Sequence, residues 1–312
     1  MKKKCPHIPQ ETHVALLMGG WNSEREVSLS TGKGFLESLT RQGYQVKALD
    51  LKRDVAELVQ FLTPRPDIVL LALHGVYVED GRLQGILDIM DIPYAPSSGA
   101  LASALATNKP IAKQLFVNAG IPCAKGGVFK WKDIQATHPM HTPYVIKPID
   151  EGSSVGVYII EKGQSPIQNK IEWPFGEEVL VEEYIPGLEL SCAVLKDKPL
   201  AVIELRAKSG FYDYKNKYTD NMTTHLIPAP IPKDVYDQIM DYSLRAHQAL
   251  GCKSISRSDF RYNPENGDIC ILELNTLPGC TPLSIVPDIC RYKGISFDEL
   301  IFTLIEDGLC RD

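Results

Sequence analysis

The strongest constraint on the fold is an alternation of apolar strands with amphipathic helices along the first ninety or so residues. Strand-like runs at 14–18, 44–49 and 67–73 alternate with helical patterns at 24–40, 55–62 and 83–90. This βαβαβα order predicts a parallel sheet covered on both faces by helices. Ligands of such sheets bind beyond the carboxyl ends of the strands, where this sequence has the loops 19–23 and His74-Gly75.

The rest of the chain has the pattern of two further lobes. A helix at 100–118 leads into strand-like runs at 144–149, 155–160 and 178–185, and later runs at 190–195, 200–207, 254–262 and 268–275 surround a helix at 235–250. A chain of 312 residues also exceeds the size of a single core. We therefore predict an α/β protein (α+β overall) with lobes at 1–105, 106–188 and 189–312.

Composition excludes several classes of function. The net charge is −6 and no basic stripe occurs, which argues against binding to a nucleic acid. No run of 18 apolar residues occurs, so the sequence predicts no membrane span. The eight cysteines show neither a C-x-x-C pair nor zinc-ligand spacing, and we expect them to be reduced thiols. Together these features predict a cytoplasmic protein.

The most specific local pattern is a pair of acidic strands near the C-terminus. If Asn266-Gly267 turns a hairpin, Asp259 lies directly opposite Glu273. Regular alternation along the second strand then turns Leu272 and Leu274 toward the core.

Two carboxylates directly opposite each other repel, and a bound cation would relieve the repulsion. Alternation places Arg257 beside Asp259 and Asn275 beside Glu273 on the same face. An all-oxygen set from Asp259, Glu273 and Asn275 suits a hard ion such as Mg²⁺. The alternative is a solvated polar face balanced by Arg257 and Arg261.

Two segments of the central region could bind a nucleotide. Lys147 ends an apolar strand, where a buried ammonium group needs a negative partner, and the small residues after it could form a phosphate-binding flap or a plain hairpin. The acidic segment 182–185, followed by Glu189, could form an adenine and ribose pocket or a solvated strand end. No G-x-G-x-x-G fingerprint and no P-loop motif is present, which argues against a dinucleotide-dependent oxidoreductase.

Three further features each allow two interpretations. Ser23 and Glu26 fit a capping box at the start of the first helix. In that case Glu24 would either complement the helix dipole or bind a ligand ammonium group. His74 could be catalytic or structural. The aromatic-rich segment 211–219 is typical either of a lid over a site or of a loop that binds a partner.

Taken together, these residues resemble the D-alanine:D-alanine ligase family of ATP-grasp enzymes. The matching stretches follow the family order from about residue 14 to 300. They are Gly19-Gly20 with 24–28, Leu73-His74-Gly75, Glu79-Asp80-Gly81, Lys147-Pro148, 151–156, 211–214, Lys217-Tyr218, Arg257 with Asp259, 273–276, Pro278-Gly279 and Leu283-Ser284. Each stretch alone is weakly diagnostic, but the ordered set is specific.

The resemblance implies a three-lobed ATP-grasp architecture, with an N-terminal substrate-binding βαβ domain and two lobes that clasp ATP. It implies catalytic roles for Glu24, Ser153, Arg257, Tyr218 and Gly279, and substrate contacts from Glu24, Ser28, His74, Lys217 and Ser284. It implies ATP contacts from Lys109, Lys147, Glu182, Glu183, Tyr184, Ile185 and Glu189. Asp259, Glu273 and Asn275 would hold two Mg²⁺ ions, with Mn²⁺ as a possible substitute.

The activity implied is ligation of two D-alanine molecules through a D-alanyl phosphate, for peptidoglycan synthesis, by a cytoplasmic homodimer. The alternatives are another ATP-grasp carboxylate–amine ligase, such as a D-alanine:D-lactate ligase, and a non-catalytic nucleotide-binding module. Glu24 and Lys217-Tyr218 favour ligation of two D-alanine molecules, because by the resemblance they contact the amino-acid substrate and not ATP. The complete metal set argues against a non-catalytic module. Val78, Leu277 and Cys280 depart from the usual family pattern without removing an implied ligand.

Overall fold

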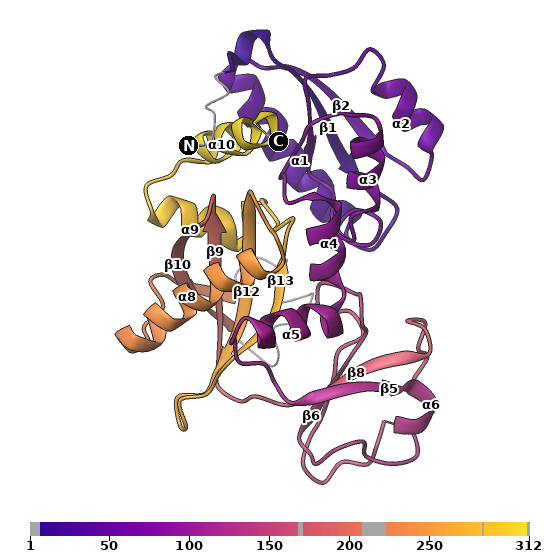
Figure 1. Ribbon diagram of the computed structural model, residues 1–312, viewed down its shortest axis with the longest axis vertical. Helices are drawn as coiled ribbons and strands as arrows, with labels where there is room; N and C mark the ends of the chain where they lie inside the picture. Colours follow the sequence, from indigo (N-terminus) through magenta and orange to yellow (C-terminus); the bar gives the residue numbers. More distant parts are fainter. Residues whose placement is uncertain (1–6, 168–170, 208–222, 283, 311–312) are drawn as a thin grey trace.

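A computed structural model of the chain describes residues 7–167, 171–207, 223–282 and 284–310. It contains one parallel and two antiparallel sheets, in the order along the chain that the sequence pattern predicts (Figure 1). None of its helices is long and apolar enough to cross a membrane, among the residues described.

The N-terminal sheet has four parallel strands in the order β2-β1-β3-β4. The strands are β1 (His13–Gly19), β2 (Gln45–Leu51), β3 (Ile68–Leu71) and β4 (Tyr94–Ala95), with helices α1 (Arg25–Gln42), α2 (Val55–Phe61) and α3 (Arg82–Ile89) and the short 3-10 helix η1 (Pro9–Glu11). The predicted alternation is confirmed, and the short η1 and β4 were not expected. Since β1 and β3 are neighbours, the loops after them lie side by side.

The start of α1 differs from the prediction. Glu24, and not Ser23, is the N-cap residue, so the expected capping box of Ser23 and Glu26 does not begin the helix. The Asn22 side chain instead accepts a hydrogen bond from the Glu24 amide at 3.0 Å. Glu24 is thereby held at the mouth of the sheet, with only 8% of the residue exposed.

The long helix predicted at 100–118 is two helices, α4 (Gly99–Thr107) and α5 (Lys109–Asn118). Asn108 separates them and caps α5 by accepting a hydrogen bond from the Ile111 amide at 3.2 Å. Pro110 lies in the first turn of α5, where its missing N–H is tolerated. The break places Lys109 in the first turn of α5.

The central sheet is antiparallel, in the order β5-β8-β6-β7. Its strands are β5 (Gly126–Lys130), β6 (Tyr144–Lys147), β7 (Tyr158–Ile160) and β8 (Glu178–Glu183), with the short helix α6 (Trp131–Ile134). The strand predicted at 155–160 begins only at Tyr158, so residues 148–157, with small side chains at 152–154 and 156, form the loop that connects Lys147 to it.

The C-terminal sheet has the order β11-β10-β9-β12-β13. Its elements are β9 (Leu188–Leu195), β10 (Lys198–Ala207), β11 (Thr223–Leu226), α8 (Lys233–Ala249), β12 (Ile255–Tyr262), β13 (Ile269–Asn275), α9 (Ile285–Tyr292) and α10 (Phe297–Leu309). Helix α10, which the sequence pattern did not predict, returns to the N-terminal lobe and packs beside α1 (Figure 1).

The predicted pairing of the acidic strands is confirmed: Asp259 lies opposite Glu273 and Arg257 opposite Asn275. The register shifts directly after this point, because Phe260 pairs with Ile271. The shift makes Leu272 the extra residue of a bulge, and its side chain lines a cleft beside Glu273. The prediction that Leu272 faces the core was therefore wrong.

Candidate active site

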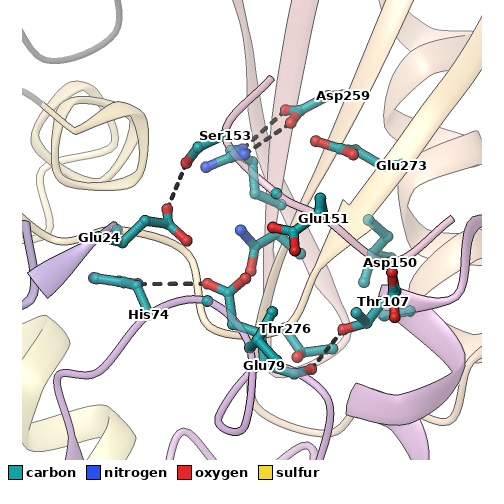
Figure 2. A pocket seen from close by; sticks show the side chains of 18 of the residues that line it. Glu24, His74, Glu79, Thr107, Asp150, Glu151, Ser153, Asp259, Glu273 and Thr276 are labelled. Atoms are coloured by element: carbon teal, nitrogen blue, oxygen red, sulfur yellow. Dashed lines mark hydrogen bonds and ion pairs between the residues drawn. The ribbon is translucent and has the colours of Figure 1, made fainter. Parts of the chain in front are cut away.

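A cleft between the three lobes collects most of the residues singled out from the sequence. One end of the cleft, the Glu24 end, is lined by Glu24, His74, Ser153, Arg257, Asn275, Gly279 and Ser284 (Figure 2). The other end, the Lys147 end, is lined by Lys147, Glu182, Glu183, Tyr184, Ile185 and Glu189. Lys109, Glu151, Asp259 and Glu273 line both ends, so the two hollows adjoin.

Glu24 contacts the central lobe at its own end of the cleft. The Ser153 hydroxyl donates a hydrogen bond to Glu24 Oε1 (Figure 2). Ser153 has a φ of 52°, a strained conformation for a residue with a side chain. Gly75 leaves room for the carboxylate, since a Cβ at this position would lie 2.8 Å from Glu24 Oε2.

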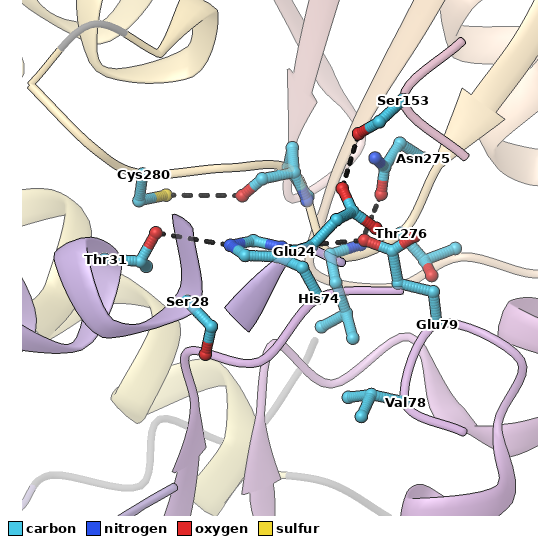
Figure 3. A network of polar contacts seen from close by, with 12 residues as sticks. Glu24, Ser28, Thr31, His74, Val78, Glu79, Ser153, Asn275, Thr276 and Cys280 are labelled. Carbon is cyan, nitrogen blue, oxygen red and sulfur yellow. Dashed lines mark hydrogen bonds and ion pairs between the residues drawn. The ribbon is translucent and has the colours of Figure 1, made fainter. Parts of the chain in front are cut away.

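His74 is clamped from both sides of its ring (Figure 3). Its Nδ1 lies 3.5 Å from Glu79 Oε1, and its Nε2 lies 3.2 Å from the Thr31 hydroxyl. The Asn22 side chain also donates to the His74 carbonyl at 2.7 Å. The ring is thus fixed in orientation beside Glu24. Reasoning from the sequence assigned no role to Thr31 or Glu79, although Glu79 belongs to a stretch that carries the family resemblance.

Ser28 lies elsewhere. It is fully buried, and its hydroxyl accepts a hydrogen bond from the Gly19 amide at 2.8 Å. This contact holds the loop between β1 and α1, and the structure does not bring Ser28 into the lining of the cleft.

The acidic wall of the cleft is held by a dense set of donors. Arg257 donates through Nε and Nη2 to the two oxygens of Asp259, each at 2.8 Å. The hydroxyl of Ser191, a fully buried residue of β9, donates to Asp259 Oδ1 at 2.6 Å. Asn275 Oδ1 accepts from the Leu277 amide at 2.9 Å. These contacts fix the direction of the side-chain oxygens.

The donor set fits a hard divalent cation. Within the described residues no group of three or more His, Cys, Asp or Glu side chains is placed to hold a metal by itself. Asp259, Glu273 and Asn275 offer two carboxylates and one amide oxygen along one edge of the cleft. Mg²⁺ commonly uses one or two carboxylates and completes its shell with water and phosphate oxygens.

Lys109 lies where the two ends of the cleft join. Its Nζ donates to the Glu151 carbonyl and lies 3.9 Å from Glu273 Oε2. Burial lowers the pKa of Lys109, and the negative charge of Glu273 offsets this only in part. A bound anion here would therefore be attracted to the Lys109 ammonium group, whose unfavourable burial Glu273 offsets only in part.

Lys147 has the negative partner that its position predicted. Its Nζ donates to Glu182 Oε2 at 2.6 Å, and Lys113 donates to the other oxygen of the same carboxylate. Burial alone would raise the pKa of Glu182, but the two ammonium groups outweigh it and hold this pKa below its usual value. Sequence analysis missed Lys113. The available signal was its position one turn after Lys109 on α5, which puts both lysines on one helix face.

Ser284 is the N-cap residue of α9, and Gly279 lies in the loop before it. The Ser284 hydroxyl accepts a hydrogen bond from the Thr281 amide at 2.9 Å, and a Cβ on Gly279 would lie 3.1 Å from that hydroxyl. A side chain at position 279 would therefore crowd Ser284. Lys217 and Tyr218, implied by the resemblance, lie outside the described residues.

This arrangement defines a class of protein. Two lobes with antiparallel sheets enclose a hollow lined by Lys109 and Lys147, and a parallel-sheet lobe closes its far end with the Glu24 carboxylate. These are the features of an ATP-grasp ligase. The family model described as D-ala D-ala ligase C-terminus matches residues 115–306. The chain belongs to the D-alanine–D-alanine ligase family and is an ATP-dependent ligase.

Similar proteins agree over nearly the whole chain. The D-alanine–D-alanine ligase of Xanthobacter autotrophicus is 48% identical over 95% of this chain and 98% of its own length. The Bacillus anthracis D-alanine–D-alanine ligase, solved in complex with ATP, superposes with a TM-score of 0.78 at 28% identity, covering 96% of this chain and 97% of that one. The VanG D-Ala:D-Ser ligase of Enterococcus faecalis superposes at 0.79 with 30% identity, covering 97% and 100%.

Proposed function

We propose that the chain joins two D-alanine molecules into D-alanyl-D-alanine for peptidoglycan synthesis, using the residues of the cleft as follows. The observation that carries the proposal is the joining of two hollows at Lys109 and Glu273, one with the buried Glu24 carboxylate and one with Lys147. An amino acid and a nucleotide held there would meet at the acidic wall.

At the Glu24 end of the cleft, the substrate end, Glu24 binds the ammonium group of the first D-alanine. The Ser153 hydroxyl holds the Glu24 carboxylate in place. His74 fixes the adjoining wall. Ser284 and Lys217 bind the carboxylate of the second D-alanine, and Tyr218 acts with Ser153 in catalysis. Catalysis by these groups is chiefly positioning, which brings two substrates into reacting distance.

At the Lys147 end of the cleft, the nucleotide end, Lys109 and Lys147 neutralise the charge of the phosphate oxygens. The segment 182–185 borders the adenine, and the Glu189 carboxylate accepts hydrogen bonds from the ribose hydroxyls. Asp259, Glu273 and Asn275 would hold two Mg²⁺ ions, or Mn²⁺, and such ions neutralise charge on the transferred phosphoryl group.

The first D-alanine carboxylate attacks the γ-phosphorus of ATP, which yields D-alanyl phosphate and ADP. The amine of the second D-alanine then attacks the acyl carbon, the C–OP bond breaks, and phosphate leaves as the peptide bond forms. Arg257 and the Gly279 amide stabilise the negative oxygen that develops on the attacked carbonyl. No covalent enzyme intermediate is required.

We further propose a cytoplasmic homodimer with lobes at 1–105, 106–188 and 189–312. The cytoplasm supplies the ATP that the reaction consumes. D-lactate and D-serine are the competing second substrates, the latter because VanG is named a D-Ala:D-Ser ligase.

The test is ADP release by the purified protein with ATP and Mg²⁺ in the presence of D-alanine, L-alanine or no amino acid, with products identified by mass. We expect release only with D-alanine, accompanied by D-alanyl-D-alanine. Equimolar competition with D-serine or D-lactate then tests the second subsite. A product that contains mainly D-serine or D-lactate at neutral pH would contradict the proposed specificity.

A further inference from the structure

Arg261 contacts the linker that joins the central and C-terminal lobes. It lies on β12, and its Nε donates to the Ile185 carbonyl at 3.0 Å while its Nη2 donates to the Gly187 carbonyl at 2.9 Å. Its guanidinium also lies 5.8 Å from the ring centre of Tyr184. One side chain therefore holds three residues of a linker that borders the nucleotide end of the cleft.

The same guanidinium faces Glu189. Arg261 and Glu189 are direct cross-strand neighbours on β12 and β9, and Arg261 Nη1 lies 3.5 Å from Glu189 Oε2. Each side chain is only 14% exposed, so solvent screens the pair poorly. Opposite charges at directly paired positions stabilise a sheet and fix the direction of both side chains.

The conformation of Gly187 is independent evidence that the linker packs closely against β12. Its φ is +108°, and a Cβ at this position would lie 2.1 Å from the Tyr262 carbonyl oxygen. Only glycine allows so close an approach of the two backbones. The linker thus packs against the C-terminal end of β12, the strand that carries Arg261.

From these contacts we infer that Arg261 is a positioning residue for the ribose end of the nucleotide pocket. It directs the Glu189 carboxylate toward the ribose hydroxyls and fixes the linker beside the adenine. The inference rests on the proposed function through the role of Glu189. An arginine is needed because its planar fork can reach two carbonyls and a carboxylate together, whereas a lysine ammonium is a single point charge.

The test compares kcat/KM for ATP with kcat/KM for 2′-deoxy-ATP and 3′-deoxy-ATP in four enzymes: wild type, Arg261→Gln, Glu189→Gln and the double variant. The wild type should prefer ATP, and Glu189→Gln should lower this preference by roughly tenfold, the size expected for a hydrogen bond to a charged group. Arg261→Gln should lower it by a similar factor. The double variant should show no further loss, because both changes remove the same contact.

Arg261→Lys keeps the charge beside Glu189 but not the fork, and it should also lose most of the preference. If Arg261→Gln fails to fold, this variant provides the measurement. The matched control is Arg65→Gln, since Arg65 also donates to a carboxylate and a carbonyl, both of Asp91, but lies outside the cleft lining. It should leave the ATP preference unchanged.

The outcomes separate the two levels of the proposal. If Glu189→Gln leaves the ATP preference intact, the ribose assignment itself is wrong. If Glu189→Gln lowers the preference but neither Arg261 variant does, Glu189 needs no positioning and the inference is overturned. A loss of activity by the Arg261 variants that is equal for ATP and both deoxy analogues would likewise show that Arg261 is only structural.

Discussion

The N-terminal and C-terminal lobes share one apolar cluster, whereas the central sheet, β5 to β8, has a cluster of its own. Leu16 of β1, Ala193 of β9 and Leu304 of α10 are fully buried members of the same cluster. Tyr144 and Ile146 of β6 belong to a separate cluster whose members, among the residues described, all come from the central lobe. Figure 1 shows the difference, with α10 lying against the N-terminal lobe and the central lobe set apart below.

This difference assigns distinct roles to the two walls of the cleft. The wall built on the shared core carries Glu24, Arg257 and the acidic pair of Asp259 and Glu273. The positions of these charges relative to one another must stay fixed. The central lobe carries Ser153 and Lys147, and it contacts the other wall through polar pairs such as Ser153 with Glu24. A net hydrogen bond contributes about 1 kcal/mol, whereas a fully buried apolar side chain contributes about 1.5–3 kcal/mol. We infer that the second wall adjusts more easily to a bound nucleotide.

The largest expected effect is on chemistry at the fixed wall. Glu273→Gln removes a charge from the proposed metal site but keeps the shape of the side chain, which is 31% exposed. We expect turnover to fall on the order of 10³-fold, as when a group that stabilises developing charge is lost, with little change in melting temperature. Steady-state kinetics and thermal unfolding measure both quantities.

Glu265→Gln is the matched control, because it makes the same chemical change at an exposed position of the same hairpin. It should alter neither turnover nor stability. A loss of melting temperature in Glu273→Gln that is as severe as its loss of turnover would show that Glu273 acts mainly in folding.

A second pair of variants tests the separation of the cores. Leu304→Ala and Ile146→Ala each leave a cavity at a fully buried position, at a cost of roughly 2–5 kcal/mol. Leu304→Ala should speed hydrogen exchange in β1 and β9 together. Ile146→Ala should speed exchange in β6 and β8 and leave β1 unchanged. Mass spectrometry of the exchanged amides gives the result, and equal acceleration of β1 by both variants would contradict two separate cores.

Features set by short-range chemistry could be predicted from the sequence. The pairing of Asp259 with Glu273 followed from the turn at Asn266-Gly267, and the negative partner of Lys147 followed from burial. Both predictions needed only strand periodicity and the cost of burying an unpaired charge.

Features set by contacts between distant segments could not. The bulge at Leu272 breaks the strand periodicity on which the prediction relied. The partner of Lys113, Glu182, lies 69 residues further along the chain, and nothing near Lys113 in the sequence indicates it. Arg261 was considered only as a charge that balances a polar face, because its linker contacts depend on how the two lobes meet.

The smallest expected effect concerns the polar rim of the shared core. Asp298 of α10 accepts hydrogen bonds from Arg41 Nη2 and from the Ser38 hydroxyl of α1, each at 2.7 Å. The bond from Arg41, with that from Ser38, holds the pKa of Asp298 below its usual value. A carboxyl group whose pKa is lowered by folding contributes stability above its unfolded pKa, near 4, and loses it as pH falls through the lower folded value.

Asp298→Asn should therefore destabilise the protein slightly at pH 7 and less at pH 3. The side chain is 36% exposed, so solvent screens the pair and the difference at pH 7 should be a fraction of about 1 kcal/mol. Urea unfolding of the wild type and the variant at pH 7, 5 and 3 measures it. A deficit that grows as the pH falls would have the wrong sign. A deficit of several kcal/mol at pH 7 would mean that charge, and not the apolar cluster around Leu304, joins the two lobes.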